Sequence, residues 1–413
     1  MTDLLELSAR FVDGAVAGGA IPDEPTNRIN LQVSEVAPDI AVVESFSHVV
    51  ALRTDDGLVL FDASLAALAE PVLGSLRRWS DDPVHTLVYT HGHVDHVGGG
   101  PAVLREAAAR GDQPPSVVAH EAVPERFDRY ALTAGYNAAV NARQFGRRGV
   151  LTDRDDEGRA VFATDFARPD VTYRERLTAE VGGTALHLHH AEGETDDHTW
   201  TWLPEHRAAS VGDLVLWVFP NAGNPQKVQR HPAEWARALR AIAAAEPELL
   251  LPAHGLPIGG RNRIAVVLDE TATVLESLVD QTLELMNDGA TLDTIVHSVR
   301  VPSHLLDRPY LQPVYDEPEF VVRNIWRLYG GWYDGNPARL KPAPDAEVAA
   351  EVAALAGGAT LLARRAEALS AAAIDADGHR LACQLAEWAV QAEPDGTAVR
   401  AVAAAVYRAR RRA

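Results

Sequence analysis

Short apolar runs separated by turn residues dominate the first part of the chain. After a polar lead-in to about Asn30, such runs occupy 40–43, 48–52 and 58–62 and are rich in Val and Leu. Runs of this length and composition between turn residues are typical of β-strands. The pattern therefore predicts a β-meander over residues 40–62.

Helical and strand patterns alternate after the meander. Apolar positions at helical spacing predict a helix over 65–76, and Leu87-Val88-Tyr89 predicts a buried strand. Pro101 opens a second helix to Arg110, because proline is favoured in a first helical turn. A further strand is expected at 117–120, so strands and helices alternate along this region.

The middle of the chain changes character twice. Residues 121–180 are less periodic and richer in Tyr, Asn and Arg, which indicates an insertion bearing on the substrate site. A helix is expected over 232–245. Further strands are expected at 185–190, 200–203, 208–211 and 249–252.

Past about Gly260, strand-like runs give way to long helical patterns rich in Ala, Leu and Glu. We therefore place a domain boundary near 262 and expect a catalytic domain over 1–262 and a helical domain over 263–413. Antiparallel helix pairs there indicate an interaction or dimerisation module, without a repeat clear enough to predict a solenoid. Its helices are expected at 263–288, at 319–329, and as three Ala-rich helices from 345 onward, broken at 357–358, 375–378 and 394–396.

Composition narrows the class of protein. A chain of 413 residues exceeds one ordinary domain. The net charge of −20 argues against nucleic acid as a partner, because phosphate binding depends on Lys and Arg. The one cysteine, Cys383, rules out an intrachain disulfide and favours a small core residue. Acid near the N-terminus and the lack of a long apolar window predict a cytoplasmic protein without membrane insertion.

A dense histidine loop follows the strand 87–89. His91, His93, Asp95 and His96 fall within six residues, and Gly98-Gly99 follow them. Imidazole and carboxylate suit Zn²⁺ and its first-row neighbours. The spacing lets His91 and His93 turn to one ion while Asp95 and His96 turn to a second, so the loop predicts a two-metal centre.

Such a centre needs further ligands, and three stretches near strand ends offer them. The first runs from His190 to His198, the second is Gly212-Asp213, and the third is His254. In the first stretch Glu194, Asp197 and His198 are all candidate donors, so the residue that completes the first site stays open among them.

The His-x-His-x-Asp-His loop with its two glycines resembles the motif of the metallo-β-lactamase superfamily. That resemblance implies an α/β fold, two β-sheets sandwiched between helices (αββα), followed here by an all-α C-terminal domain. It implies a dinuclear centre with His91, His93 and Glu194 on one metal, Asp95, His96 and His254 on the other, and Asp213 between them. We expect two Zn²⁺, with Mn²⁺ or iron as alternatives, and a bridging hydroxide as nucleophile or base. Through these ions Asp95, His96 and Asp213 would be catalytic.

The C-terminal part narrows the resemblance. The stretch 324–337 contains Gly-Trp-Tyr-Asp-Gly-Asn-Pro and, with Gly357-Gly358-Ala359, resembles the dimerisation domain of alkyl sulfatases. This implies a homodimer and a small-molecule ester substrate, most simply an alkyl sulfate. Members of that family often continue into a sterol-carrier-like domain, so a chain ending at Ala413 favours a shorter or different ester.

Substrate contacts are expected in two polar segments. Asn221 lies after Asp213 at the spacing of a sulfate-binding Asn in alkyl sulfatases, while Gln226 and Lys227 stand where that family has an Arg. An Asn- and Gly-rich turn is an equally good interpretation of this segment. In the second segment, which resembles a Gly-Asn-x-x-x-Arg-Arg stretch of that family, the candidates are Tyr136, Asn137, Asn141 and Arg143.

Three functions remain in competition at this stage. The leading prediction is a dinuclear metal-dependent hydrolase of an alkyl sulfate or related ester. A carboxylic ester, thioester or lactone hydrolase would use the same metals. A diiron oxidoreductase is the third, because carboxylate-rich ligand sets also suit iron.

Overall fold

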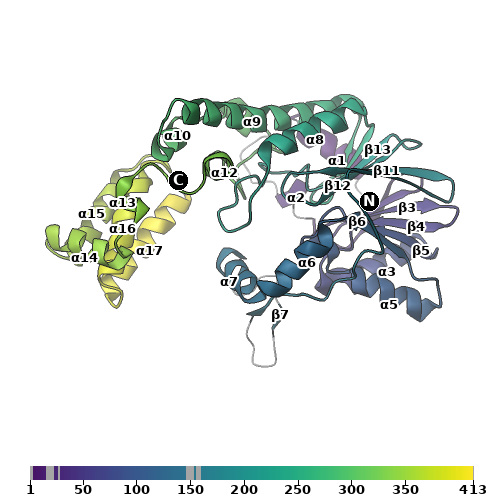
Figure 1. The fold of residues 1–413 in the computed structure, drawn as a ribbon, viewed down its shortest axis with the longest axis horizontal. Coiled ribbons are helices and arrows are strands. Elements are labelled where there is room, and N and C mark those ends of the chain that lie inside the picture. Colours follow the sequence, from purple (N-terminus) through teal and green to yellow (C-terminus); the bar gives the residue numbers. More distant parts are fainter. Residues whose placement is uncertain (1–2, 15–22, 27, 146–152, 155–159, 413) are drawn as a thin grey trace. The chain divides into compact units, whose positions relative to one another are not determined.

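The computed structural model describes residues 3–14, 23–26, 28–145, 153–154 and 160–412. Two large sheets form the centre of the fold (Figure 1). In the first sheet, β1 to β4 are antiparallel neighbours and β4, β5, β6 and β9 are parallel. Its strands are β1 (Val33–Ala37), β2 (Ile40–Val43), β3 (Val49–Thr54), β4 (Gly57–Phe61), β5 (Val84–Val88), β6 (Ser116–His120) and β9 (Val171–Tyr173). The predicted meander is confirmed, and β1 is an additional strand.

The second sheet is antiparallel except where β13 and β14 run parallel. Its strands are β10 (Arg176–Val181), β11 (Thr184–Ala191), β12 (His198–Leu203), β13 (Ala208–Gly212), β14 (Leu249–Pro252) and β15 (Ile258–Gly259). The four strands predicted between 185 and 252 are confirmed, within one or two residues at most ends.

The two sheets pack face to face, and the side chains alternate between two cores as strand geometry requires. In β4, Val59 and Phe61 face the second sheet and meet Leu186 and Leu251 there. Leu58 and Leu60 face the opposite way, toward helices. The period of two along these apolar strands therefore fills both faces of a sheet that is buried on both sides.

Helices cover the outer face of each sheet (Figure 1). The helices α3 (Ala69–Trp79) and α5 (Gly100–Arg110) share a core with the first sheet. The helices α8 (Pro232–Ala244) and α9 (Arg261–Asn287) share a core with the second. The predicted αββα sandwich is confirmed.

The N-terminal lead-in holds a helix that the polar pattern did not predict. Helix α1 (Leu4–Val12) is capped by Asp3, whose side chain accepts hydrogen bonds from the amides of Leu5 and Glu6. Leu4, Leu7 and Phe11 bury one face of α1 in the core of the second sheet. A short helix α2 (Asp23–Thr26) follows.

The segment 121–180 is more regular than its sequence indicated. Helices α6 (Val123–Leu132) and α7 (Ala134–Phe145) occupy its first part, and the short strands β7 (Asp153–Arg154) and β8 (Ala160–Val161) pair beyond them. Residues 146–152 and 155–159 lie outside the described part of this predicted insertion.

The helical region begins where the composition changes, at α9. The helices α10 (Leu292–Ser298), α11 (Ser303–Leu306) and α12 (Pro318–Gly330) follow. Residues of α9 and α12, such as Leu268 and Val321, are buried in the same core as Trp235 of α8. By their internal contacts the described residues form two compact units, one extending to Trp332 and the other from Tyr333 to the C-terminus. The domain boundary near 262 stays a prediction.

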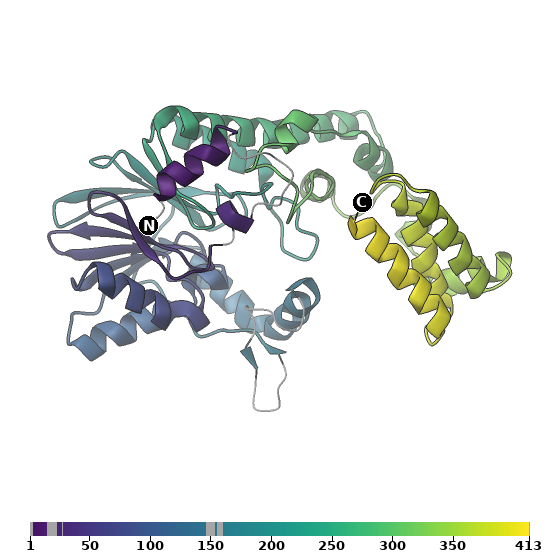
Figure 2. The same ribbon diagram turned by 180° about the vertical axis from the view of Figure 1, so that it is seen from behind.

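The C-terminal unit is a helical bundle (Figure 2). It begins with α13 (Pro337–Leu340), and among the described residues four further helices follow, where we expected three. The helices are α14 (Asp345–Leu355), α15 (Ala359–Ala372), α16 (His379–Ala392) and α17 (Thr397–Arg412). The three predicted breaks are present, and three breaks divide the stretch into four helices. Cys383 lies buried among alanines of this bundle.

No single helix of the described segments has the length and apolarity needed to cross a bilayer. The pair α14 and α15 passes that test only together, and the two helices are bent by 85° at their junction.

Candidate metal centre

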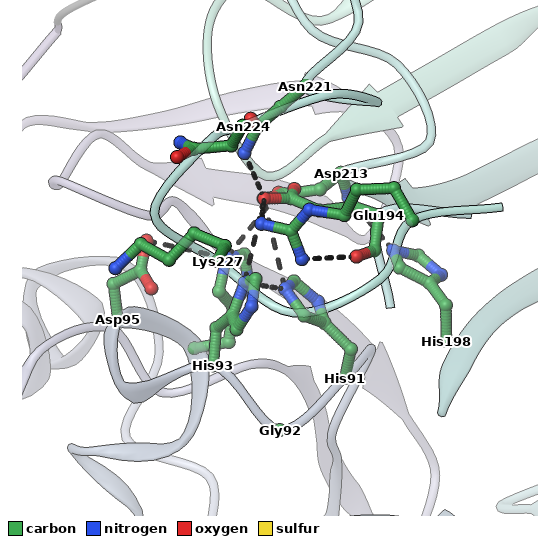
Figure 3. Close-up of polar contacts among 12 residues, drawn as sticks. His91, Gly92, His93, Asp95, Glu194, His198, Asp213, Asn221, Asn224 and Lys227 are labelled. Carbon is green, nitrogen blue, oxygen red and sulfur yellow. Dashed lines mark hydrogen bonds and ion pairs between the residues drawn. The ribbon is translucent and has the colours of Figure 1, made fainter. Parts of the chain in front are cut away.

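The histidine loop leaves the carboxyl end of β5 and enters the short helix α4 (Val94–Val97). His91 and His96 are fully buried, and the Nε2 atom of His91 lies 2.9 Å from Nδ1 of His93. The imidazoles converge with Glu194 and Asp213 (Figure 3). The loop thus directs its imidazole nitrogen atoms to a region just beyond the edge of the sheet.

Two groups of candidate ligands form there, each with its donor atoms within 4.8 Å of one another. The first contains His91, His93, Glu194 and Asp213, and the second contains Asp95, His96 and His254. Glu194 follows β11, Asp213 follows β13 and His254 follows β14. All seven predicted ligands therefore meet, although they come from four separate segments.

Asp213 lies between the two groups. One of its carboxylate oxygens, Oδ2, is 3.8 Å from Nε2 of His91. The other, Oδ1, is 3.4 Å from Nε2 of His96 and 3.6 Å from Nε2 of His254. Each oxygen therefore faces a different group, the arrangement that a carboxylate shared by two cations requires.

Unpaired buried atoms show that this donor set fits metal ions. The Nε2 atom of His96 and the Oδ1 atom of Asp213 are buried without a well-formed hydrogen bond. Buried polar atoms in proteins nearly always have a partner. Imidazole nitrogens and carboxylate oxygens at these spacings match the ligands that Zn²⁺ takes.

The electrostatics of the site point the same way. Burial, with the nearby Asp213 carboxylate, raises the pKa of Glu194 to about 8. Burial lowers the pKa of His91 well below its usual range, and the neighbouring His96 lowers it further. For Asp213, burial would raise the pKa, but the charges of His96 and His254 outweigh it and lower the pKa. The carboxylates raise the pKa of His96 and His254 against the effect of burial, so these rings carry positive charge where a bound cation would take the place of their protons.

Asp62 orients His96, and sequence reasoning did not single it out. The Oδ2 atom of Asp62 is 2.7 Å from Nδ1 of His96 and accepts from the hydroxyl of Thr90 at 2.8 Å, while Oδ1 accepts from the amide of Thr90 at 2.7 Å. A carboxylate on one imidazole nitrogen directs the other toward a metal. The available signal was its position directly after the strand 58–61, which neighbours the strand that carries the histidine loop.

A buried ion pair holds the histidine loop against the stretch that bears Glu194. The side chain of Arg126 donates from Nε to Oδ2 of Asp197 at 2.5 Å and also pairs with Asp196. The same Asp197 oxygen accepts from the amide of Gly92 at 3.1 Å. The Oδ2 atom of Asp197 is thus bound to Arg126 and Gly92, and Nε2 of His198 accepts from the amide of Asp213. Of the three candidate donors left open in this stretch, the geometry groups Glu194 with the histidines of the described chain.

Glu194 has its own polar support, which the sequence did not reveal. Arg230 is fully buried and binds both the carbonyl oxygen and the side chain of Glu194. The side-chain amide of Asn221 also donates to the Glu194 carboxylate. Asn324 of α12 in turn anchors the backbone of Arg230. Helix α12 therefore helps to position a candidate ligand from a distant part of the sequence.

A cavity of about 680 Å³ opens onto these ligands. Its walls include the predicted substrate contacts Tyr136, Asn137, Asn141, Asn221, Gln226 and Lys227. Lys227 donates from Nζ to Oδ1 of Asn141 at 2.9 Å, so two of these residues already bind one another. Arg143 approaches Gln226 at 3.4 Å and does not line the cavity as the described residues outline it. The roles of these residues toward a substrate stay predictions.

Comparisons with known proteins agree with this geometry. The model of the metallo-beta-lactamase superfamily matches residues 42–254, and the alkyl sulfatase dimerisation model matches residues 291–413. A linear primary-alkylsulfatase from Pseudomonas sp. is 29% identical over 322 residues, which cover 74% of this chain and 60% of that protein. An (R)-specific secondary-alkylsulfatase from Pseudomonas sp. is 27% identical over 395 residues, covering 90% and 58%. The chain thus spans about 60% of the length of these relatives.

A solved structure, that of a stereoselective inverting sec-alkylsulfatase from Pseudomonas sp., shares the fold. It superposes with a TM-score of 0.79 at 24% identity, over 92% of this chain and 62% of that one. Together with the histidine–carboxylate groups, the family match indicates a metal cofactor. The chain belongs to the metallo-beta-lactamase superfamily.

Proposed function

We propose that this protein is a dinuclear zinc hydrolase of an alkyl sulfate or a related ester. The observation that carries the proposal is the composition of the cavity wall. His93, Asp95, Glu194, Asp213 and His254 line the same cavity as a set of apolar side chains and four cationic ones, Arg129, Lys227, Arg230 and Arg327. A substrate with an anionic head and a greasy chain matches such a wall.

Each of the two groups of candidate ligands would hold one metal ion. His91, His93 and Glu194 would hold one ion, Asp95, His96 and His254 the other, and Asp213 both. Two divalent ions at such a site supply hydroxide near neutral pH and stabilise anionic oxygens of the transition state. Asp62 would fix the ring of His96, and Arg126 would fix the loop that carries His91 and His93.

Lys227 and Arg230 would bind the sulfate head. Lys227 is partly buried, and burial together with nearby Arg230 lowers its pKa. Arg230 is fully buried beside Glu194. Positive side chains in a partly desolvated site interact with an anion more strongly than they would in water. We expect the sulfate to lie near Lys227 and Asn221, on the side of the cavity that carries Glu194.

The apolar part of the wall would bind the alkyl chain. Tyr130, Phe162 and Leu216 line the cavity together with Phe145, Val218, Val228 and Val314. These side chains come from α6, α7, the segment after β8, the loop beyond β13 and the segment before α12. Phe145 stacks on Tyr315 across this wall with ring centroids 6.2 Å apart. We further propose that the protein is a homodimer, supported by the match of its C-terminal part to a dimerisation family.

The test combines metal analysis with a substrate panel. Purified protein is analysed for metals and assayed for sulfate release from medium-chain alkyl sulfates, and in parallel on carboxylic esters, thioesters and lactones. His93→Ala is compared with His297→Ala, which changes an exposed histidine on α10. We expect His93→Ala alone to lower turnover, by at least about a hundredfold.

Two results would contradict the proposal. One is less than about one ion per chain in metal-replete protein, and the other is full activity in His93→Ala. Turnover of acyl esters without any release of sulfate would instead assign the metals to carboxylic ester hydrolysis. Oxygen consumption by iron-loaded protein would assign them to oxidation.

A further inference from the structure

The cavity contains a positive charge that neither the metal ligands nor the proposed sulfate site uses. Arg129 lies on α6, is partly buried, and lines the cavity. Within the described segments its guanidinium makes no hydrogen bond or ion pair, and its carbon lies 5.6 Å from the centre of the Tyr130 ring beside it. A partly buried guanidinium without a carboxylate is unusual in a chain with 58 acidic residues.

The carboxylates closest to Arg129 are already bound. Asp196 and Asp197 both pair with Arg126, one helical turn before Arg129. Burial and the charge of Arg126 lower the pKa of Arg129. Arg129 therefore lies in an environment that disfavours its charge, and an anion placed in the cavity would offset that cost.

Two polar side chains, those of Thr133 and Asn137, lie beside Arg129 on the same wall of the cavity. The amide of Thr133 bonds to the carbonyl of Arg129, and the amide of Asn137 bonds to the carbonyl of Thr133. This helical spacing carries across the junction of α6 and α7, so Arg129, Thr133 and Asn137 lie on one side. All three line the cavity.

Side-chain hydrogen bonds hold Thr133 and Asn137 in place. The Thr133 hydroxyl donates to the carbonyl oxygen of Arg129 at 2.7 Å and accepts from Nδ2 of Asn137 at 2.9 Å. An amide nitrogen carries two hydrogens, so Asn137 keeps one for a ligand. Arg129 and Asn137 together offer N–H donors to a planar anion.

We propose that Arg129 and Asn137 bind a second anionic group of the substrate, a carboxylate at the end of the chain away from the sulfate. This inference rests on the proposed function and narrows its substrate class to sulfate esters that also carry a carboxylate. The planar fork of a guanidinium matches a carboxylate in a bidentate manner. The apolar wall lies in the same cavity, so one chain can contact both polar ends.

The kinetic test compares alkyl sulfates of equal length that end in a methyl group or in a carboxylate. Chain lengths from about four to twelve carbons cover the span that a cavity of this size admits. The wild-type protein is expected to prefer the carboxylate at one or more lengths, measured as a ratio of kcat/KM. Arg129→Gln should lower that ratio about tenfold to a hundredfold, as expected for a lost charged hydrogen bond. Arg327→Gln, which changes an exposed arginine of the same cavity, should leave the ratio within about twofold.

A binding test decides the inference without turnover. Titration calorimetry of metal-free protein measures the same two ligands, and the carboxylated one should bind about tenfold more tightly to the wild type. The difference should vanish in Arg129→Gln. Equal binding and equal kcat/KM of both ligands at every length would overturn the inference while leaving alkyl sulfate hydrolysis intact. If no sulfate ester is turned over, the proposed function fails, and the calorimetry still decides the inference.

Discussion

Replacing Asp62 by Asn tests whether His96 is a metal ligand whose orientation depends on a buried carboxylate. Asp62 is 1% exposed and receives three donors: the amide and hydroxyl of Thr90 and the Nδ1–H group of His96. Two carboxylate oxygens satisfy all three. An asparagine keeps one acceptor oxygen and adds an NH₂ group of nearly the same shape, so the change alters hydrogen bonding with little change in packing.

The size of the expected effect follows from the hydrogen-bond donor that loses its acceptor when Asp62 becomes asparagine. In either orientation of the asparagine amide, its NH₂ group faces a donor, either the Thr90 amide or the His96 ring. A buried donor without an acceptor costs about 1–3 kcal/mol. If the ring of His96 changes tautomer to escape that cost, its Nε2 atom carries the proton and cannot bind a metal. We therefore expect the affinity for one metal ion to fall about tenfold to a hundredfold, as for other carboxylates behind a ligating histidine.

The assay is a zinc titration against a competing chelator, with folding monitored by circular dichroism. Asp170→Asn is the control, because Asp170 accepts a hydrogen bond from the amide of Val117 at 3.0 Å and touches none of the candidate ligands. Thr90→Val, which removes the hydroxyl that shares the Asp62 carboxylate, should weaken binding less than Asp62→Asn does. Unchanged zinc affinity in a folded Asp62→Asn variant would refute the reasoning that His96 binds metal through Nε2.

Two further predictions concern the loop and the division of the chain. Gly92→Ala places a Cβ atom 2.7 Å from Cδ of Arg126 and 2.9 Å from Oδ2 of Asp197. Urea unfolding should therefore show that the free energy of unfolding falls by about 1–3 kcal/mol. The control, Gly74→Ala, has open space around the added Cβ atom and should not destabilise the protein. A Gly92→Ala variant as stable as the wild type would contradict this account of the Arg126–Asp197 pair. Truncation after Trp332 should leave a soluble, folded protein that light scattering shows to be a monomer. Truncation after residue 262 should give a fragment that precipitates, because it uncovers Trp235 and Leu239. A soluble, cooperatively folding 1–262 fragment would show that α9 is dispensable.

The elements that the sequence predicted well are those whose pattern is local. The strands from β2 to β4 are apolar on both faces and bounded by turns, and α5 has a proline in its first turn. The histidine loop is equally local, because its ligands lie within six residues. Helix α1 was missed because its apolar positions lie within nine residues, in a lead-in without strong signals.

The supporting residues of the site could not be predicted in the same way. Arg126 and Asp197 are 71 positions apart, and Arg230 and Asn324 are 94 positions apart. Nothing in the local sequence distinguishes Arg126 from the other arginines of the chain. Their partners are determined by the packing of α6 and α12, which single-sequence patterns do not specify. Ligands are recognisable because their chemistry restricts residue type, whereas any residue that supplies a donor at the right place can support them.

Near residue 262 the type of secondary structure changes, but the buried core continues across that point. The composition changes at α9, yet Ile264, Val267 and Leu268 of that helix are buried against Trp235 of α8 in the core of the second sheet. A domain is held together by shared buried surface, not by the type of element that supplies it. Removing α9 would expose apolar area on α8 at a cost of about 25 cal/mol for each Å². The sequence marks where strands end, and the buried face of α9 decides whether the chain can be cut there.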